Sequence, residues 1–222
     1  MLTVVIPTLN AAAVLPACVA ALGGVRVVVA DGGSTDHTIE VATALGARVV
    51  TAPRGRGVQL AAAAEAALAD GARWLLLLHA DTVLTRGWRT EAERFMAAPD
   101  KAGYFRLAFD EDSAGARRVA RLANWRARTF GLPYGDQGLL ISAPLYRAVG
   151  GIRPLPLMED VDLARRLGRA RLAALDASAV TSAARYRRDG WWLRPLRNLT
   201  LLGLFLAGVP ARRLVRAYET RR

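Results

Sequence analysis

Residues 3–10 read TVVIPTLN, a β-branched apolar run that stops at a proline and polar residues. Such a run predicts a buried strand followed by a loop. Four apolar strands are expected in the first half, at residues 3–7, 25–30, 48–51 and 74–78. Segments of helical composition lie between them, at residues 11–22, 38–45 and 58–69. This alternation predicts an α/β fold with a mainly parallel central sheet covered by helices.

Each of these strands is followed closely by a polar or charged side chain, namely Asn10, Asp31, Arg54 and Asp81. In open parallel sheets, ligands bind beyond the carboxyl ends of the strands. We therefore expect these four side chains to lie along one binding edge of the sheet.

The second half of the chain is less regular. It predicts a strand at residues 103–109 and a basic helix at residues 114–129. A loop rich in Gly, Pro and Tyr is expected at residues 131–138, and a helix with acidic residues in its first turn at residues 158–167. No internal repeat or Gly/Ser linker is present. We expect one domain over residues 1–190 and a C-terminal amphipathic, basic helical extension over residues 191–222.

The composition excludes several classes of protein. A hydrophobic fraction of 53% over 222 residues excludes a disordered basic tail. The single Cys18 excludes a disulfide framework and a cysteine-ligated zinc site, and fits a reducing compartment. No secretory leader is visible, and the apolar run at residues 199–209 is shorter than the roughly 20 residues that span a bilayer. We expect a cytoplasmic protein, with the inner face of the membrane as a further location.

The net charge of +12 is unevenly distributed. Residues 1–111 carry 10 basic and 11 acidic side chains, whereas residues 112–222 carry 21 and 8. A surface this basic predicts an anionic partner, such as a nucleic acid, a membrane or a phosphorylated substrate. All basic residues but Lys101 are arginines, so codon bias is an alternative source of part of the excess.

Four motifs, in this order and approximate spacing, resemble the family 2 glycosyltransferases of the GT-A fold. They are residues 4–11 (VVIPTLNA), 31–36 (DGGSTD), 79–81 (HAD) and 158–160 (MED). The resemblance covers roughly residues 1–188. The HAD triplet and the loop PYGDQG at residues 133–138 resemble a narrower bacterial subgroup, the arsenosugar-biosynthesis-type glycosyltransferases.

The resemblance implies a nucleotide-sugar donor, UDP-linked, at the strand ends. Its nucleotide-binding positions correspond here to Pro7, Thr8, Asn10, Asp31, Gly32, Arg54, Ala80 and Asp81. Asp31 would accept a hydrogen bond from the base edge, and Arg54, in the segment RGRG at residues 54–57, would contact the diphosphate. Turn formation is the alternative role for Asp31. Asn10 is equally interpreted as a helix N-cap, and Asp36 is expected to cap the helix that starts at Thr38.

The family's Asp-x-Asp metal motif is His79-Ala80-Asp81 in this chain. The resemblance therefore assigns a divalent cation, Mg²⁺ or Mn²⁺, to Asp81. These hard cations prefer oxygen ligands, so the replacement of the first carboxylate by His79 is expected to weaken the site. His79 is interpreted equally as a ribose or phosphate contact and as a core histidine.

Glu159 and Asp160 resemble the family's acidic pair on the acceptor side. The resemblance implies that Asp160 is the general base of an inverting transfer, with Glu159 beside it in a supporting role. A charged first turn of a helix is the alternative. Asp136 and Gln137 are expected in the acceptor pocket, with turn formation as their alternative.

The C-terminal basic and aromatic segment leaves several roles open. By resemblance, Arg185 and Arg188 are candidates for the diphosphate, although the family's Gln-x-x-Arg-Trp motif is missing. Residues 191–209 predict either a helix lying on a membrane or a helix packed on the domain or on another subunit. The expected partners are a nucleotide-sugar donor and an acceptor that is anionic or lipid-linked; a homo-oligomer and a membrane contact remain open.

Two other function classes are alternatives. A nucleotidyltransferase would need a Gly-rich basic loop after the first strand, where this chain has Thr8-Leu9-Asn10-Ala11. A basic, non-enzymatic module for nucleic acid or anionic membrane is compatible with the charge alone. No nucleic-acid-binding motif accompanies that charge, so nucleic acid is not an expected partner.

Overall fold

The computed structural model describes the backbone of residues 1–219. Its centre is an eight-stranded sheet with the order β3-β2-β1-β4-β7-β6-β8-β5. The strands are β1 (Leu2–Thr8), β2 (Arg26–Asp31), β3 (Arg48–Thr51), β4 (Trp74–Leu77), β5 (Thr82–Leu84), β6 (Ala102–Phe109), β7 (Leu139–Ser142) and β8 (Leu172–Thr181). The predicted α/β class with a helix-covered sheet is confirmed.

The first four strands, β3, β2, β1 and β4, are all parallel. In this register Thr8 pairs with Asp31, so the carboxyl ends of β1 and β2 lie at one edge. The second half departs from this pattern, because β7 runs antiparallel to both β4 and β6. The loop before β7 therefore reaches the same edge of the sheet as the residues that follow β4.

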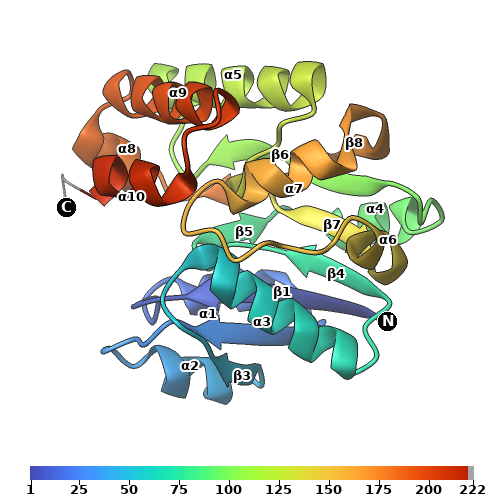
Figure 1. Cartoon of the computed structure of the whole chain (residues 1–222). Helices are drawn as coiled ribbons and strands as arrows, with labels where there is room; N and C mark the ends of the chain where they lie inside the picture. Colours follow the sequence, from blue (N-terminus) through green and yellow to red (C-terminus); the bar gives the residue numbers. More distant parts are fainter. Residues whose placement is uncertain (220–222) are drawn as a thin grey trace.

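Helices cover both faces of the sheet (Figure 1). They are α1 (Leu15–Ala21), α2 (Thr38–Ala44), α3 (Arg56–Ala69), α4 (Trp88–Phe95), α5 (Ala114–Phe130), α6 (Ala143–Ala148), α7 (Glu159–Leu167), α8 (Ala184–Asp189), α9 (Leu193–Leu206) and α10 (Ala211–Glu219), with 3-10 turns η1 (Gly135–Gln137) and η2 (Arg169–Arg171). One core lies between the sheet and α1, α2 and α4, and a second between the sheet and α3, α6 and α7.

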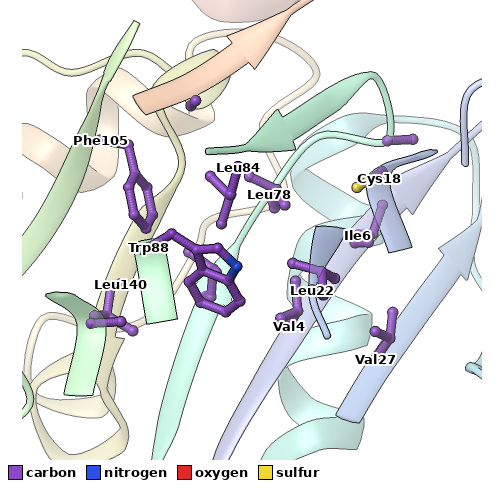
Figure 2. Close-up of a cluster of buried hydrophobic side chains, with 14 of the residues drawn as sticks. Val4, Ile6, Cys18, Leu22, Val27, Leu78, Leu84, Trp88, Phe105 and Leu140 are labelled. Atoms are coloured by element: carbon purple, nitrogen blue, oxygen red, sulfur yellow. The ribbon is translucent and has the colours of Figure 1, made fainter. Parts of the chain in front are cut away.

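Figure 2 shows the first of these cores, in which aliphatic side chains of β1 and β2 meet α1 and Trp88 of α4. Cys18 is buried there among apolar neighbours. Its burial raises the pKa of the thiol to about 12. Cys18 therefore acts as a small apolar packing residue in this core.

Local patterns predicted the first half closely and the second half incompletely. The strand at residues 48–51 and the helices at residues 38–45 and 58–69 correspond to β3, α2 and α3. The helix expected at residues 11–22 begins only at Leu15, because a turn precedes it. Strands β5, β7 and β8 were not predicted, since their apolar stretches are short or rich in alanine.

The last helices pack against the domain. Leu201 and Leu202 of α9 and Leu214 of α10 form a third core with Val161 of α7 and Leu157, which precedes that helix. Among the described residues, no helix combines the length and the apolar character needed to cross a bilayer. The division into residues 1–190 and 191–222 stays a prediction.

Candidate active site

The ends of β1 and β2 form a closed polar network around Asp31, which is 1% exposed. Its carboxylate accepts hydrogen bonds from the Thr8 hydroxyl (3.1 Å), the Ser34 hydroxyl (2.5 Å) and the backbone amides of Gly33 (3.0 Å) and Ser34 (2.8 Å). Burial disfavours the charged form, but these four donors outweigh it and lower the pKa of Asp31. Asp31 is therefore held as a carboxylate at the strand edge.

Gln59 of α3 ties this edge together and was not singled out from the sequence. Its side chain is buried, and Nε2 donates to the carbonyls of Thr8 (2.6 Å) and Ala30 (2.9 Å). Its Oε1 accepts from the amide of Gly55 (3.2 Å). A Cβ on Gly32 would lie 2.8 Å from Nε2 of Gln59. A single amide thus joins two strands to the loop before α3 and explains the glycine at position 32.

Asn10 binds the neighbouring loop and does not cap α1. Its backbone is left-handed (φ 52°), its Oδ1 accepts from the amide of Thr35 (2.8 Å), and its own amide donates to Ser34 Oγ (2.8 Å). Val14 occupies the N-cap position of α1, so the N-cap interpretation of Asn10 is wrong. Asp36 Oδ1 accepts from the amide of Thr38 (3.0 Å), the first residue of α2, but His37 occupies the N-cap position of that helix, so Asp36 is not its N-cap.

A cleft opens next to this edge, beyond the ends of β4 and β8. It is lined by charged and polar residues from several elements, among them Arg56, His79, Asp81, Asp136, Asp160, Arg185, Arg194 and Asn198. Four of the predicted site residues therefore share one cleft: Asp81, Asp136, Asp160 and Arg185. Arg54 and Arg188 are exposed and are not among the lining residues.

Arg56, at the start of α3, is the arginine of the RGRG segment that reaches the cleft. Its Nε lies 2.7 Å from Oε1 of Glu159, whose side chain is 1% exposed. Its Nη1 lies 3.2 Å from Nε2 of His79. Burial raises the pKa of Glu159, and the Arg56 charge partly opposes that rise. Arg56 thus links the strand end after β4 to the acidic helix α7.

The geometry fixes the ionisation and the tautomer of His79. Burial and the charges of Arg56 and Arg185 hold its pKa well below the usual range, so the imidazole is neutral. Arginine has only donors, so His79 Nε2 is the acceptor and the ring proton is on Nδ1. A Cβ on Gly135 would lie 2.5 Å from this Nε2, which accounts for the glycine in the loop before β7.

Asp160 lies in the first turn of α7 with its carboxylate in the cleft. Its Oδ2 accepts from the amide of Gly135 (2.6 Å) and its Oδ1 from the amide of Val161 (2.8 Å). These two donors fix the carboxylate and leave lone pairs for a ligand. The preceding Met158 has a left-handed backbone (φ 65°), which costs a non-glycine residue about 1–2 kcal/mol. Strain of this kind often accompanies functional sites.

Asp136, in η1, has an incomplete set of partners. No partner within the described chain hydrogen-bonds its buried Oδ1. Burial and the nearby carboxylates of Asp160 and Asp81 raise the pKa of Asp136 to about 6, although Arg126 and Arg56 oppose the shift. The carboxyl is therefore available for a ligand that supplies a hydrogen bond or positive charge.

Gln137 is fully buried and faces away from the cleft. Its Nε2 donates to the Phe105 carbonyl (3.1 Å) and to Asn124 Oδ1 (3.2 Å), and its Oε1 accepts from the Tyr134 amide (3.3 Å). These contacts make Gln137 a residue that positions the loop. The expectation that it lines an acceptor pocket is therefore wrong.

Asp81 is the candidate metal ligand. Its side chain is 24% exposed in the cleft, and Arg185 Nη2 lies 3.9 Å from its Oδ2. In the described part of the chain, no three acidic, His or Cys side chains are grouped so that they could hold a metal ion. A cation at Asp81 would therefore need most of its oxygen ligands from a bound substrate.

Comparisons with known proteins agree with this geometry. The model of the family described as "Glycosyl transferase family 2" matches residues 3–144. A Mycobacterium tuberculosis protein, named PGL/p-HBAD biosynthesis glycosyltransferase, is 42% identical over 94 residues. The match covers 38% of this chain and 36% of the length of that relative.

Solved structures of glycosyltransferases share the fold. Staphylococcus aureus TarS, residues 1–349, superimposes with a TM-score of 0.65 at 15% identity, covering 96% of this chain and 68% of TarS. Glucosyl-3-phosphoglycerate synthase of M. tuberculosis, solved with Mn²⁺, UDP and product, gives 0.54 at 20% identity, covering 82% and 70%. The mannosyltransferase PcManGT of Pyrobaculum calidifontis, solved with GDP-Man and Mn²⁺, gives 0.58 at 17% identity, covering 97% and 78%. The predicted GT-A-like fold is confirmed.

Proposed function

The chain belongs to glycosyl transferase family 2, and from this premise we propose that it moves a sugar from a UDP-linked donor to an acceptor hydroxyl with inversion. The observation that carries the proposal is the cleft in which Asp81, Asp136 and Asp160 lie together with Arg56 and Arg185. Carboxylates for a cation and a base, next to arginines for a diphosphate, are the groups that this reaction needs.

The nucleoside would lie along the ends of β1 and β2. Thr8, Asn10, Asp31 and Gly32 line this edge, and the main chain of Pro7 and Ala80 borders it. The four donors on Asp31 leave it ionised, as a base-edge N–H would require. Because these donors belong to the protein, binding of the base requires one of them, such as the Ser34 hydroxyl, to turn away.

The diphosphate would lie between Asp81 and the arginines of the cleft. Arg56 takes the place of Arg54 and Arg185 is kept, whereas Arg188 is dropped, because Arg54 and Arg188 do not line the cleft. Asp81 and the oxygens of the diphosphate suit a divalent cation, Mg²⁺ or Mn²⁺, which supplies charge neutralisation for the leaving group. The solved complexes of similar fold with UDP, GDP-Man and Mn²⁺ support this donor class.

Asp160 would remove the proton of the acceptor hydroxyl. Its carboxylate is fixed by two backbone amides and lines the same cleft as the arginines that suit the donor. As the hydroxyl oxygen attacks the anomeric carbon, its proton passes to Asp160 and the UDP leaves. Glu159 does not line this cleft; its bond to Arg56 orients that arginine instead.

The acceptor would enter on the side of Asp136 and the basic second half of the chain. That half carries 21 basic and 8 acidic side chains, which suits an anionic or lipid-linked acceptor. The narrower likeness to arsenosugar-biosynthesis-type enzymes stays a prediction about the subgroup to which the chain belongs. So do the cytoplasmic location and a homo-oligomeric state.

Calorimetric titration tests the donor assignment. We expect UDP and a UDP-sugar to bind in the presence of Mn²⁺ and to bind more weakly after chelation. Asp81→Asn should remove the dependence on metal, whereas the matched control Asp162→Asn, on α7 and paired with Arg166, should keep it. Indifference to every nucleoside diphosphate with Mn²⁺ would contradict the proposal.

A further inference from the structure

The two helices α5 and α9 carry most of the exposed apolar surface of the molecule. Nine of the thirteen large hydrophobic side chains that are exposed in the described part of the chain lie on them or at their ends. They are Leu122, Trp125, Phe130, Trp192, Leu193, Leu196, Leu199, Leu204 and Leu206. Exposed apolar side chains that gather on two helices indicate an interaction surface in a folded protein.

The most exposed apolar side chains of α9 and its start lie on one face of the helix. Trp192, Leu196 and Leu199 follow a spacing of three to four residues and are 70%, 63% and 54% exposed. The opposite face is also apolar, since Leu201 and Leu202 are buried in the third core. The outward face of α9 carries no charged residue, because Arg194 lines the cleft with its side chain 11% exposed and Arg197 is half-buried.

Helix α5 adds positive charge beside apolar side chains. Arg117, Arg121 and Arg128 are exposed along it, next to Leu122 and Trp125, and residues 114–130 contain no acidic side chain. Its start lies against the start of α9, because the Arg118 guanidinium stacks 3.6 Å from the centre of the Trp192 ring. Both helices lie at the same end of the molecule, away from α2 (Figure 1).

We propose that the outer faces of α5 and α9, here called the α5–α9 face, bind the surface of an anionic membrane. Leucines and a tryptophan on a helix face insert between lipid headgroups, and a row of arginines is attracted to anionic lipids. An RNA or DNA partner would leave the uncharged leucine face of α9 unused. Arg117 pairs with Asp112 of its own chain. Two copies packed face to face would bring Arg121 and Arg128 of both copies close together, and residues 114–130 contain no acidic side chain to separate them.

Helix α9 also borders the cleft, through Asn198 and Leu201. Binding through the α5–α9 face would therefore hold the cleft next to the membrane. If the proposed function holds, the acceptor itself is carried by the membrane. The binding of lipid by the α5–α9 face does not depend on the proposed function.

Flotation with vesicles tests the proposal on the full chain. We expect it to float with phosphatidylcholine vesicles that contain phosphatidylglycerol, and to float much less with phosphatidylcholine alone or at high salt. Leu196→Glu combined with Leu199→Glu should lower the bound fraction at least about tenfold, since charge on the inserted face is costly. Arg121→Glu combined with Arg128→Glu should abolish the preference for the anionic lipid.

The matched control is Ile39→Glu on α2, where Ile39 is 39% exposed, and it should float as the unchanged protein does. Circular dichroism checks that each variant is folded, and calorimetry with UDP and Mn²⁺ separates loss of lipid binding from loss of donor binding. Failure to float with either vesicle overturns the proposal. So does a dimer in vesicle-free solution that Leu196→Glu and Leu199→Glu dissociate, because a second copy would then cover this face.

Discussion

Asp31 at the end of β2 and Asp136 before β7 lie at the same edge of the sheet, yet their surroundings differ. Asp31 has four donors from its own chain and a lowered pKa. Asp136 has a buried oxygen without a partner and a pKa raised to about 6. The carboxylate at the donor edge is thus satisfied by the protein itself, whereas in the cleft around α7 the Oδ1 of Asp136 has no hydrogen-bond partner among the described residues. Proteins commonly concentrate such perturbed groups where chemistry takes place.

The largest expected effect is a loss of sugar transfer, caused by a change in the cleft around α7. Asp160→Asn keeps the shape and the hydrogen-bond acceptor for Gly135 but removes the base, so sugar transfer should fall about a thousandfold. Binding of UDP with Mn²⁺ should change little, because the proposed donor contacts lie elsewhere. The measurement is release of UDP from a UDP-sugar with a panel of hydroxyl acceptors, alongside calorimetry.

Asp162→Asn serves as the matched control on the same helix, since Asp162 pairs with Arg166 and Arg153 outside the cleft. Near-normal transfer by Asp160→Asn would remove it as the base and would shift attention to Asp136.

The next largest effect is a loss of stability when the ion pair between Arg56 and Glu159, which joins α3 to α7, is broken. Arg56→Met would leave Glu159, 1% exposed, without its positive partner and should lower the free energy of unfolding by about 3 kcal/mol. Adding Glu159→Gln should recover part of the loss, because a neutral side chain costs less to bury. Urea unfolding measures both. The control is Arg54→Met, at an exposed position two residues away, which should lower the free energy of unfolding by no more than about 0.5 kcal/mol. If Arg54→Met and Arg56→Met lowered it equally, the ion pair with Glu159 would be unimportant.

The stability of the protein should also depend on pH through Asp136 in the cleft. Because the pKa of Asp136 rises from 3.8 to about 6, the native state binds its proton more tightly than the unfolded chain. Stability is therefore lost as the pH rises from about 4 to about 6, by up to about 3 kcal/mol. Asp136→Asn removes this loss, so its stability relative to the unchanged protein should increase over that window. Urea unfolding across the window measures the difference, and a constant difference would show that Asp136 is not perturbed.

The sequence was informative where the signal is local. The β-branched runs and the glycines after Asp31 identified β1–β4 and the binding edge, because a strand end and a tight turn depend on neighbouring residues. Among the cleft residues, Asp81 and Asp160 were found through the ordered motifs, Asp136 through the glycine-bracketed loop, and Arg185 through the basic and aromatic C-terminal segment. In contrast, the choice of Arg54 over Arg56 was wrong for the cleft, since α3 begins two residues earlier than expected and turns Arg56 inward.

Other features depend on contacts between distant segments. Gln59 was detectable only as a polar residue within an alanine-rich helix, and its two carbonyl partners belong to other strands. Gln137 looked like a ligand in a glycine-bracketed loop, but its partners on β6 and α5 make it a positioning residue. Arg194 and Asn198 reach the cleft because α9 returns over it, which no local pattern in residues 191–209 could indicate.

The smallest effect is expected at the donor edge, where the sign of the pH dependence is reversed. Asp31 has a lowered pKa, so its hydrogen bonds stabilise the fold above the ordinary carboxyl pKa of 3.8, and this contribution is lost as the pH falls below that value. Asp31→Asn should therefore cost about 1–2 kcal/mol near neutral pH and progressively less in acid, because an amide cannot replace a carboxylate that accepts four bonds.

Urea unfolding of Asp31→Asn and Asp136→Asn at matched pH values makes the comparison direct. As the pH rises, the gap between the unchanged protein and Asp31→Asn should widen in favour of the unchanged protein, whereas the gap for Asp136→Asn should move in favour of the variant. Two gaps that move in the same direction would mean that both carboxyls have similar surroundings. In that case the distinction between a satisfied carboxylate at the donor edge and an unsatisfied one in the cleft would not hold.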